Sequence, residues 1–193
     1  MELMIVLAVG TVLTVMSIVH LQPTLQGFRA NAAQSAVEGA LRRAREIAIS
    51  DRRTVAVQFG ADAFGNSQVS LSQYQLIGVP PAVVQVLNPN PILVIPIQNS
   101  VTFRLFPQMP DTPDRFGNAA PVEFGGVAYG PGSILNFQSD GTFTDGLGNT
   151  VNGSVFMGIQ NFPSSARAVT VLGATGRVKA YNGTGNSWFV HGM

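Results

Sequence analysis

The chain has 193 residues, a length that fits one domain, or one domain with an appended element. Hydrophobic residues make up 46% of it and charged residues only 11%, whereas soluble domains carry about 25% charged residues. The mean hydropathy of +0.25 excludes both a plain soluble domain and a protein with many membrane spans, and it fits one apolar segment joined to a polar head. The net charge of +1 predicts no strong attraction to nucleic acid, and the absence of cysteine excludes disulfides, thiol nucleophiles and cysteine-bound metals.

The first segment, residues 1–22, is apolar. From Leu3 to Val19 every residue is hydrophobic, a glycine or a small hydroxyl residue. A helix rises about 1.5 Å per residue, so roughly 20 such residues span a hydrocarbon core of about 30 Å. A cleaved signal peptide would need a positive amino-terminal region, but no Lys or Arg precedes Arg29 and no small-residue cleavage site follows the apolar run. We therefore predict a retained transmembrane or filament-core helix.

Glu2 is the only acidic residue of this segment. A carboxylate at the edge of an apolar helix is costly unless it is paired, although the N–H groups and dipole of a helix N-terminus compensate it in part. Two interpretations stay open. Glu2 faces water at the membrane interface, or it pairs with the terminal amine of a neighbouring subunit in an assembled bundle.

The string from Glu2 to Gly10 resembles the start of mature type IV pilins and type II secretion pseudopilins, because it combines a lone Glu with an uninterrupted apolar helix. The resemblance implies a pilin fold and an assembly role for Glu2 in setting the register of the filament. The glycine cleavage site and the aromatic first residue of the family are absent, and Met1 directly precedes Glu2. We therefore expect a start codon placed too far downstream or a trimmed chain, which the prepilin peptidase could not process in this form.

Residues 23–53 read as the amphipathic continuation of the helix. Pro23 predicts a bend, so we expect one long helix from Glu2 to Ser50, with its second half packed on the head. The arginines of this segment form either a patch for anionic lipid or nucleic acid, or a solvated face that acidic neighbours partly neutralise, and we favour the second. The apolar residues at helical spacing are Leu25, Phe28, Ala32, Ala36, Ala40, Ile47 and Ala48, and the arginines are Arg42, Arg43, Arg45, Arg52 and Arg53.

Residues 54–193 read as a β-rich head. Short β-branched and aromatic runs alternate with glycine and asparagine turns, which predicts antiparallel strands. Two proline-rich stretches, residues 79–96 and 107–121, predict extended surface loops or edge strands. The fold class is therefore α+β, with a long helix packed on an antiparallel, β-sandwich-like head. The expected strands are residues 54–59, 67–71, 101–106, 134–137, 155–159, 168–172, 177–181 and 188–190.

No residue pattern in the chain points to catalysis or to a cofactor. His20 and His191 are isolated, and nucleophile elbows, zinc-binding helices and phosphate-binding loops are absent from the sequence. A membrane-anchored hydrolase is therefore disfavoured, and we predict that the protein is not an enzyme. The segment 140–149, with Asp140, Asp145 and Asn149, offers oxygen ligands for calcium, but β-hairpin turns account for it fully and no metal site is predicted.

The turn and strand from Gly173 to Lys179 carry two basic residues, Arg177 and Lys179, whose spacing places them on one face of a strand. Together with residues 44–57 and 134–142, this segment resembles the GspH/FimT branch of the pilin family and its carboxy-terminal Gly-Arg-x-Arg/Lys signature. In FimT-type minor pilins of DNA uptake such a turn contacts DNA phosphates, whereas in GspH-type pseudopilins it is part of the scaffold. So few cations would bind DNA weakly, and we favour the scaffold role.

The preferred function is a minor pilin-like structural subunit, a GspH-type pseudopilin of a type II secretion pseudopilus. The resemblance implies a single pass through the bacterial inner membrane, a periplasmic head, and partnership with other pilin-like subunits and inner-membrane lipid. A small-molecule substrate is not expected. The alternative is a FimT-type minor pilin of a type IV pilus that binds DNA through Arg177 and Lys179.

Overall fold

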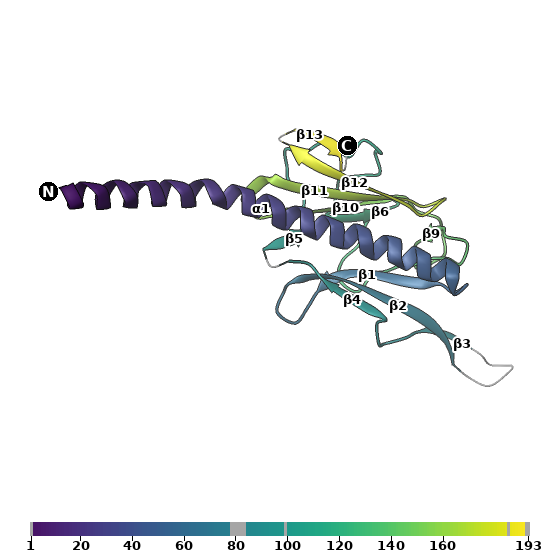
Figure 1. Ribbon diagram of the computed structural model, residues 1–193. Coiled ribbons are helices and arrows are strands. Elements are labelled where there is room, and N and C mark those ends of the chain that lie inside the picture. The colour runs from purple at the N-terminus through teal and green to yellow at the C-terminus, as the bar shows by residue number, and fades with distance from the viewer. Residues whose placement is uncertain (1, 78–83, 99, 185, 192–193) are drawn as a thin grey trace.

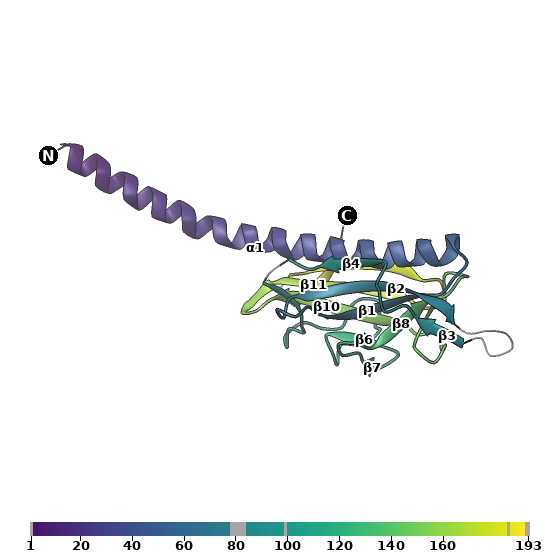
Figure 2. The same cartoon turned by 90° about the horizontal axis from the view of Figure 1, so that it is seen from below.

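The computed structural model describes the backbone of residues 2–77, 84–98, 100–184 and 186–191, and the side chains within these ranges except those of residues 2–21, 76 and 84. Helix α1 (Glu2–Ser50) runs through Pro23 without interruption. Its N-terminal half projects away from the β-rich head, and its direction changes where it reaches the head (Figures 1 and 2). The predicted class, a long helix packed on an antiparallel β head, is confirmed.

The C-terminal half of α1 buries a narrow stripe of small side chains against the head. The stripe repeats every three or four residues, as one helical face requires, and its alanines let the backbone approach the sheets closely. The predicted apolar face was partly wrong, because Ala32 is exposed and Leu25 and Phe28 are 53% and 64% exposed. Alanine occurs on both the buried and the exposed side of this helix. The spacing of its apolar residues alone therefore did not identify the buried face. The stripe consists of Ala30, Ala33, Gln34, Val37, Ala40, Leu41, Ala44 and Ala48.

Buried polar groups fix the position of the helix on the sheets. Gln34 Nε2 donates to the carbonyl oxygens of Ala168 at 3.2 Å and Tyr181 at 2.8 Å. Arg167 Nε donates to Asn31 Oδ1 at 2.7 Å. Buried donors must find acceptors at defined positions, whereas apolar contacts tolerate sliding. These bonds therefore specify where along the head the alanine stripe docks.

The helix ends at Ser50 in a Schellman-type cap. The N–H of Arg53 donates to the Ala48 carbonyl at 3.1 Å, and Arg52 between them adopts a positive φ of 52°. Glycine is the usual residue at this position because it has no Cβ. The chain thus places a basic side chain where backbone geometry alone would favour glycine.

The head consists of two antiparallel sheets. In the first, the order is β3-β2-β1-β8-β9 and β4 also pairs with β2. In the second, the order is β13-β12-β11-β10-β6-β7 and β5 also pairs with β10. The strands of the first sheet are β1 (Val55–Ala61), β2 (Ser67–Ile77), β3 (Val84–Leu87), β4 (Leu93–Pro96), β8 (Ile134–Phe137) and β9 (Phe143–Thr144). Those of the second are β5 (Val101–Phe103), β6 (Val122–Phe124), β7 (Val127–Ala128), β10 (Gly153–Ile159), β11 (Phe162–Leu172), β12 (Arg177–Thr184) and β13 (Ser187–Val190).

Both sheets and the helix share one hydrophobic core. The rings of Phe59 on β1 and Phe124 on β6 stack with centroids 6.2 Å apart, which joins one sheet to the other. Phe143 contacts Phe124 at 5.1 Å and Phe137 at 4.6 Å. Aromatic pairs at such distances add to the free energy of burial. The helix and the two sheets therefore bury their apolar residues in one common core, while the sandwich-like packing of the sheets stays a prediction.

Every predicted strand overlaps a strand of the structure. The proline-rich stretch 79–96 contains β3 and β4, which both lie along the edge of β2 and so satisfy the edge-strand alternative. Its residues 78–83 lie outside the described part. The stretch 107–121 contains no strand. Hydrogen bonds of Asp114 and of the Pro110 carbonyl connect it to the second sheet instead. The short strands β6, β7 and β9 were not predicted, because two or three residues carry too little periodicity.

The described side chains include no helical stretch long and apolar enough to cross a membrane. The predicted membrane or filament-core segment, residues 1–22, lies outside that part except for residue 22. Glu2 and His20 also lie outside it.

Substitutions at two glycines allow the contributions of backbone conformational freedom and of close packing to the free energy of unfolding to be measured separately. Gly39 is on the exposed face of α1 and a Cβ there meets nothing within 4 Å, whereas a Cβ on Gly173 would lie 2.4 Å from the Val151 carbonyl oxygen. We expect Gly39→Ala to raise the free energy of unfolding by about 1 kcal/mol, because alanine is the better helix former. We expect Gly173→Ala to lower it by about 1–3 kcal/mol through overpacking. Urea unfolding followed by fluorescence of Trp188, the single tryptophan, measures both, and equal effects would contradict the packing.

Candidate functional site

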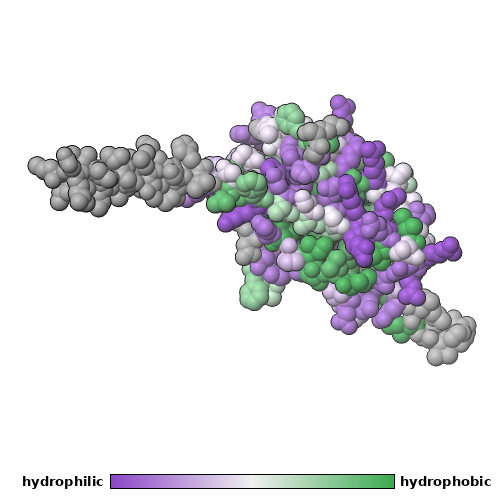
Figure 3. All heavy atoms as spheres, viewed as in Figure 1, coloured by the Kyte–Doolittle hydropathy of each residue, from purple (hydrophilic) through white to green (hydrophobic). Residues whose placement is uncertain are grey.

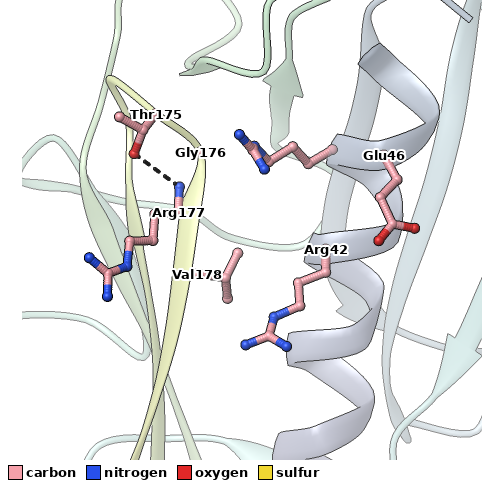
Figure 4. A pocket seen from close by; sticks show the side chains of 7 residues that line it. Arg42, Glu46, Thr175, Gly176, Arg177 and Val178 are labelled. Atoms are coloured by element: carbon pink, nitrogen blue, oxygen red, sulfur yellow. Dashed lines mark hydrogen bonds between the residues drawn. The ribbon is translucent and has the colours of Figure 1, made fainter. Parts of the chain in front are cut away.

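Strand β12 places Arg177 and Lys179 on its outer face. Side chains alternate along the strand. Val178 and Ala180 face the core and are only 8% and 5% exposed to solvent. Figure 4 shows the side chain of Arg177 pointing away from the helix and Val178 pointing toward it. The two predicted basic residues therefore share a face, but their surroundings differ.

Lys179 is ion-paired. Its Nζ lies 2.6 Å from Asp114 Oδ1, and the other oxygen of Asp114 accepts from Tyr181 Oη at 2.8 Å and Thr170 Oγ1 at 2.7 Å. Asp114 comes from the loop between β5 and β6, and its three partners belong to β11 and β12. The carboxylate thus clamps the loop onto the second sheet and leaves Tyr181 only 2% exposed.

The clamp shifts two pKa values in opposite directions. Burial raises the pKa of Asp114, but the hydrogen bonds from Lys179, Thr170 and Tyr181 outweigh it and hold the pKa below the ordinary carboxyl value. The hydrogen bond to Asp114 raises the pKa of Lys179 against the effect of burial. Both groups are therefore ionised at neutral pH, and each neutralises the other.

The sequence did not reveal Asp114 as a partner of Lys179, because 65 residues separate them. The segment lies in the proline-rich stretch predicted only as a loop or edge strand. An acidic residue in such a loop carries no signal of the strand on which it docks.

An open depression of about 590 Å³ lies on the other side of the same turn. Helix α1 contributes Arg42, Arg45 and Glu46, and the β11–β12 turn contributes residues 175–178 (Figure 4). The N–H of Arg177 donates to Thr175 Oγ1 at 3.3 Å, which orders the turn. Two sequence features that were considered separately, the helix arginines and the Gly-Arg-x-Lys segment, thus meet in one place.

The side chain of Arg45, which lines this depression, lies against two glycines. Gly176 has a φ of +60°, and a Cβ on it would lie 2.2 Å from the Gly141 carbonyl oxygen and 3.0 Å from Arg45 Cδ. A Cβ on Gly141 would lie 3.3 Å from Arg45 Nε. Side chains at either glycine would displace the arginine, so the two turns position its guanidinium.

The cations around the depression are not equivalent. Arg42 pairs with Glu38 one helical turn away, and Arg43 lies 3.6 Å from Glu46. Among the described residues, Arg45 and Arg177 have no carboxylate within ion-pair distance, and the buried Nε of Arg45 has no hydrogen-bond acceptor. Uncompensated charge in the described residues of this site is therefore concentrated at Arg45 and Arg177.

The remaining candidate groups serve local structure. Asp140 accepts from the N–H and hydroxyl of Thr142, and Asp145 accepts from the N–H groups of Leu147 and Asn149. The oxygens of the calcium candidate are thus engaged in their own turns. His191 Nδ1 contacts the side chain of Asn182, and Arg167 is buried against the helix.

The comparisons with known proteins concern fold. No family model matches the chain, and no curated protein matches it in sequence. Its structure is similar to that of the type IV minor pilin FimU of Pseudomonas aeruginosa, with 14% identity over 82% of this chain and 91% of that chain and a TM-score of 0.47. A second crystal form of FimU gives 15% identity over 78% and 90% and a TM-score of 0.45. The minor pseudopilin EpsH from the type 2 secretion system of Vibrio cholerae gives 11% identity over 86% and 99% and a TM-score of 0.43.

The clamp predicts an acid-sensitive stability. Because folding lowers the pKa of Asp114, its stabilising contribution is complete above the ordinary carboxyl pKa, 3.8, and is lost as pH falls through the folded value. We expect Asp114→Asn to lower the free energy of unfolding at neutral pH and to flatten its decline in acid. Urea unfolding of both proteins from neutral pH down through that range measures this, and parallel curves would show that Asp114 does not contribute.

Proposed function

We propose that this chain is a structural subunit of a pilin-like filament and that α1 anchors it and then packs into the filament core. The observation that carries the proposal is the length of helix beyond the head (Figures 1 and 2). The first residue of α1 in the buried stripe is Ala30. Gln26 and Gly27 are already partly buried, so the 24 residues from Glu2 to Leu25 extend beyond the head for about 36 Å at 1.5 Å per residue.

The apolar side chains of this extension must be shielded from water by lipid or by other helices. It is apolar from Leu3 to Val19, and apolar surface of that extent is costly in water. A helix has no unpaired backbone groups along its middle, so lipid or other apolar helices cover it equally well. A subunit that leaves the membrane can exchange lipid for the helices of its neighbours. Glu2, paired with the terminal amine of a neighbour, would set the register of that exchange.

The surface of the head next to the helix supports contact between subunits. Leu25 and Phe28 are exposed on α1, and β4 exposes Leu93 and Val94 at 36% and 41%. Figure 3 shows apolar surface gathered on the face that carries the helix. Isolated exposed apolar side chains need no explanation, but a group beside a projecting apolar helix favours a packing surface.

The finer proposal is a minor, GspH-type subunit of a type II secretion pseudopilus. Such a subunit passes once through the bacterial inner membrane, holds its head in the periplasm, and assembles with other pilin-like subunits. It acts mechanically and through contacts, without turnover. The neutralised Lys179 supports this role, because the Gly-Arg-x-Lys segment then stabilises the head through the Asp114 clamp.

A second candidate is a DNA-uptake minor pilin. The observation in its favour is the uncompensated charge of Arg45 on α1 and of Arg177 at the start of β12. Phosphate contacts supply most of the affinity of non-specific DNA binding, and each contact adds to its salt dependence. Two cations provide few such contacts, so the first candidate is preferred.

Cysteine cross-linking tests the filament proposal without background, because the chain contains no cysteine. Single variants Val9→Cys and Val15→Cys are produced in full-length chain, in cells that assemble the native filament. We expect oxidation to yield disulfide adducts between apolar helices, either between two copies of this chain or with another pilin-like subunit that carries a cysteine introduced in its own apolar helix. The matched control is Leu147→Cys, a side chain 89% exposed on a turn of the head, which should cross-link less. Equal yields at all three positions would contradict helix-mediated assembly.

DNA binding separates the two candidates. For the preferred function we expect no salt-sensitive binding of duplex DNA by the full chain in detergent. If the second candidate is correct, Arg177→Ala weakens binding and reduces the slope of log K against log salt by about 0.9 for each lost contact. Lys179→Ala should then change the slope little, because Asp114 already neutralises that side chain. Equal losses in the two variants would contradict the neutralised state of Lys179.

A further inference from the structure

Two short strands end the sheets on opposite sides of α1. Within the part of the chain that the structure describes, β4 pairs with β2 alone and β13 pairs with β12 alone. Figure 1 shows β4 below α1 and β13 above it. Each strand therefore has one row of backbone N–H and C=O groups that no described strand of the same chain pairs with.

Both open edges are apolar and exposed. Charged side chains and bulges usually keep an edge strand from pairing with another chain, but β4 reads Leu-Val-Ile-Pro and β13 reads Ser-Trp-Phe-Val. Pro96 removes an N–H only at the last position of β4. Leu93 and Val94 are 36% and 41% exposed, and Phe189 and Val190 are 57% and 43% exposed. Edges of this kind favour pairing with a strand of another molecule.

Val94 is the residue of β4 whose backbone groups point outward. The N–H of Ile97 donates to a carbonyl of β2, and the direction of bonding alternates along an antiparallel strand. Leu93 and Ile95 therefore also bond toward β2, whereas Val94 faces away from it. Side chains alternate between the two faces as well. Ile95 packs against the shared core, so Leu93 lies on the core-facing side and Val94 on the opposite side.

The corresponding residues of β13 are Trp188 and Val190. The N–H of His191 donates to a carbonyl of β12, so Phe189 also bonds toward β12, and its two neighbours direct their backbone groups outward. The ladder places the side chain of Phe189 on the same face as Ala180, a residue of the shared core. Each edge thus has its outward backbone groups and its core-facing side chains on alternate residues.

Strand β4 runs antiparallel to α1. Ile92, just before the strand, lines a depression together with Ser50 at the end of the helix. Pro96, at the other end of the strand, lines a second depression together with Arg29, close to the projecting half of the helix. The strand therefore runs from the end of α1 back toward its projecting half.

Strand β13 runs parallel to α1. The start of β12 lies beside Arg45, and Gln34, further toward the N-terminus of the helix, donates to the carbonyl of Tyr181 later in β12. Strand β12 is therefore antiparallel to α1, and β13 pairs antiparallel with β12. When two copies stand side by side with parallel helices, β4 of one copy and β13 of the other run antiparallel. This is the more stable of the two ways in which strands pair.

We propose that β4 of one copy pairs with β13 of a second copy, so that the first sheet of one head continues into the second sheet of the next. This inference rests on the proposed filament function. Val94 exchanges its backbone hydrogen bonds with Trp188 or Val190, and either register places a core-facing residue of β4 opposite Phe189. The contact joins two different surfaces, so it generates an open filament unless its rotation closes a ring.

The strand pairing acts together with the helices. A stable protein interface buries about 1,200 Å² or more, which two strands of four residues each do not reach by themselves. Packing of the apolar helices supplies the larger contact. The strand pairing then fixes how each head is turned about the helix axis, because backbone hydrogen bonds form only at defined positions.

Site-directed cross-linking tests the pairing in the full-length chain, in cells that assemble the filament. One tagged copy carries Leu93→Cys or Ile95→Cys, and a second, differently tagged copy carries Phe189→Cys. We expect a disulfide-linked heterodimer from one of the two β4 positions. Opposite residues that exchange no hydrogen bonds have Cα atoms about 4.5 Å apart, which is within disulfide range. Val94→Cys is the matched control, because it is equally exposed on the same strand but faces the opposite side, and it should give little adduct.

A proline variant tests the hydrogen bonds of the contact. Val94→Pro, added to the copy that carries the cysteine on β4, removes the outward N–H and leaves the bonds to β2 in place, since an edge strand tolerates proline at such a position. We expect the adduct yield to fall about two- to tenfold, the effect of one lost hydrogen bond. Urea unfolding of the variant, followed by fluorescence of Trp188, should stay unchanged. An unchanged adduct yield would overturn the pairing.

The outcomes separate this inference from the filament proposal. Adducts through Val9→Cys without an adduct from either Leu93→Cys or Ile95→Cys would overturn the strand pairing and leave the filament proposal in place. Absence of both kinds of adduct would overturn both. Equal yields from Val94→Cys and from the two core-facing positions of β4 would show random collision between heads and would also overturn the pairing.

Discussion

The close approach of α1 to both sheets is the constraint on which the rest of the structure depends. Alanines along the buried stripe allow the helix to lie directly on the strands, and larger side chains there would separate it from the core. Gln34 and Arg167 then fix its position along the head through buried hydrogen bonds. Because the docked half ends near Ala30, the apolar half must extend beyond the head. The projecting segment that suggests a filament is thus a consequence of where the alanine stripe begins. The close approach of the helix also brings Arg45 to the β11–β12 turn.

Pairing, more than the number of basic residues, decides which charges are available at the surface. Lys179 is the only lysine of the chain, yet Asp114 neutralises it, and this ion pair holds the loop that carries Asp114 on the second sheet. Arg42 and Arg43 have acidic neighbours on α1. Arg45 and Arg177 belong to distant segments and have no such neighbours among the described residues. A basic segment that looks continuous in the sequence therefore separates into neutralised and uncompensated groups.

The segments of the form Asp-x-Phe/Leu-Gly-Asn show how tertiary contacts override local sequence. Residues 62–66 and 145–149 form the same self-bonded turn, as their shared residues require. Residues 114–118, Asp-Arg-Phe-Gly-Asn, have the same pattern. There, Asp114 bonds instead to Lys179, Tyr181 and Thr170, and the N–H of Gly117 donates to Asp111. A carboxylate that reaches a cation and two hydroxyls gains more than one that accepts from its own turn.

The sequence by itself determined the features that arise from local patterns: the apolar N-terminal helix, its end at Ser50, the longer strands and the turns between them. Periodicity and turn residues suffice for these because they act over a few neighbouring positions. The buried face of the helix, the Asp114–Lys179 clamp and the meeting of Arg45 with the β11–β12 turn were decided only by the tertiary structure. Each joins residues far apart in the chain. In an alanine-rich helix the pattern does not mark the buried face, and no local pattern records which distant carboxylate will neutralise a given cation.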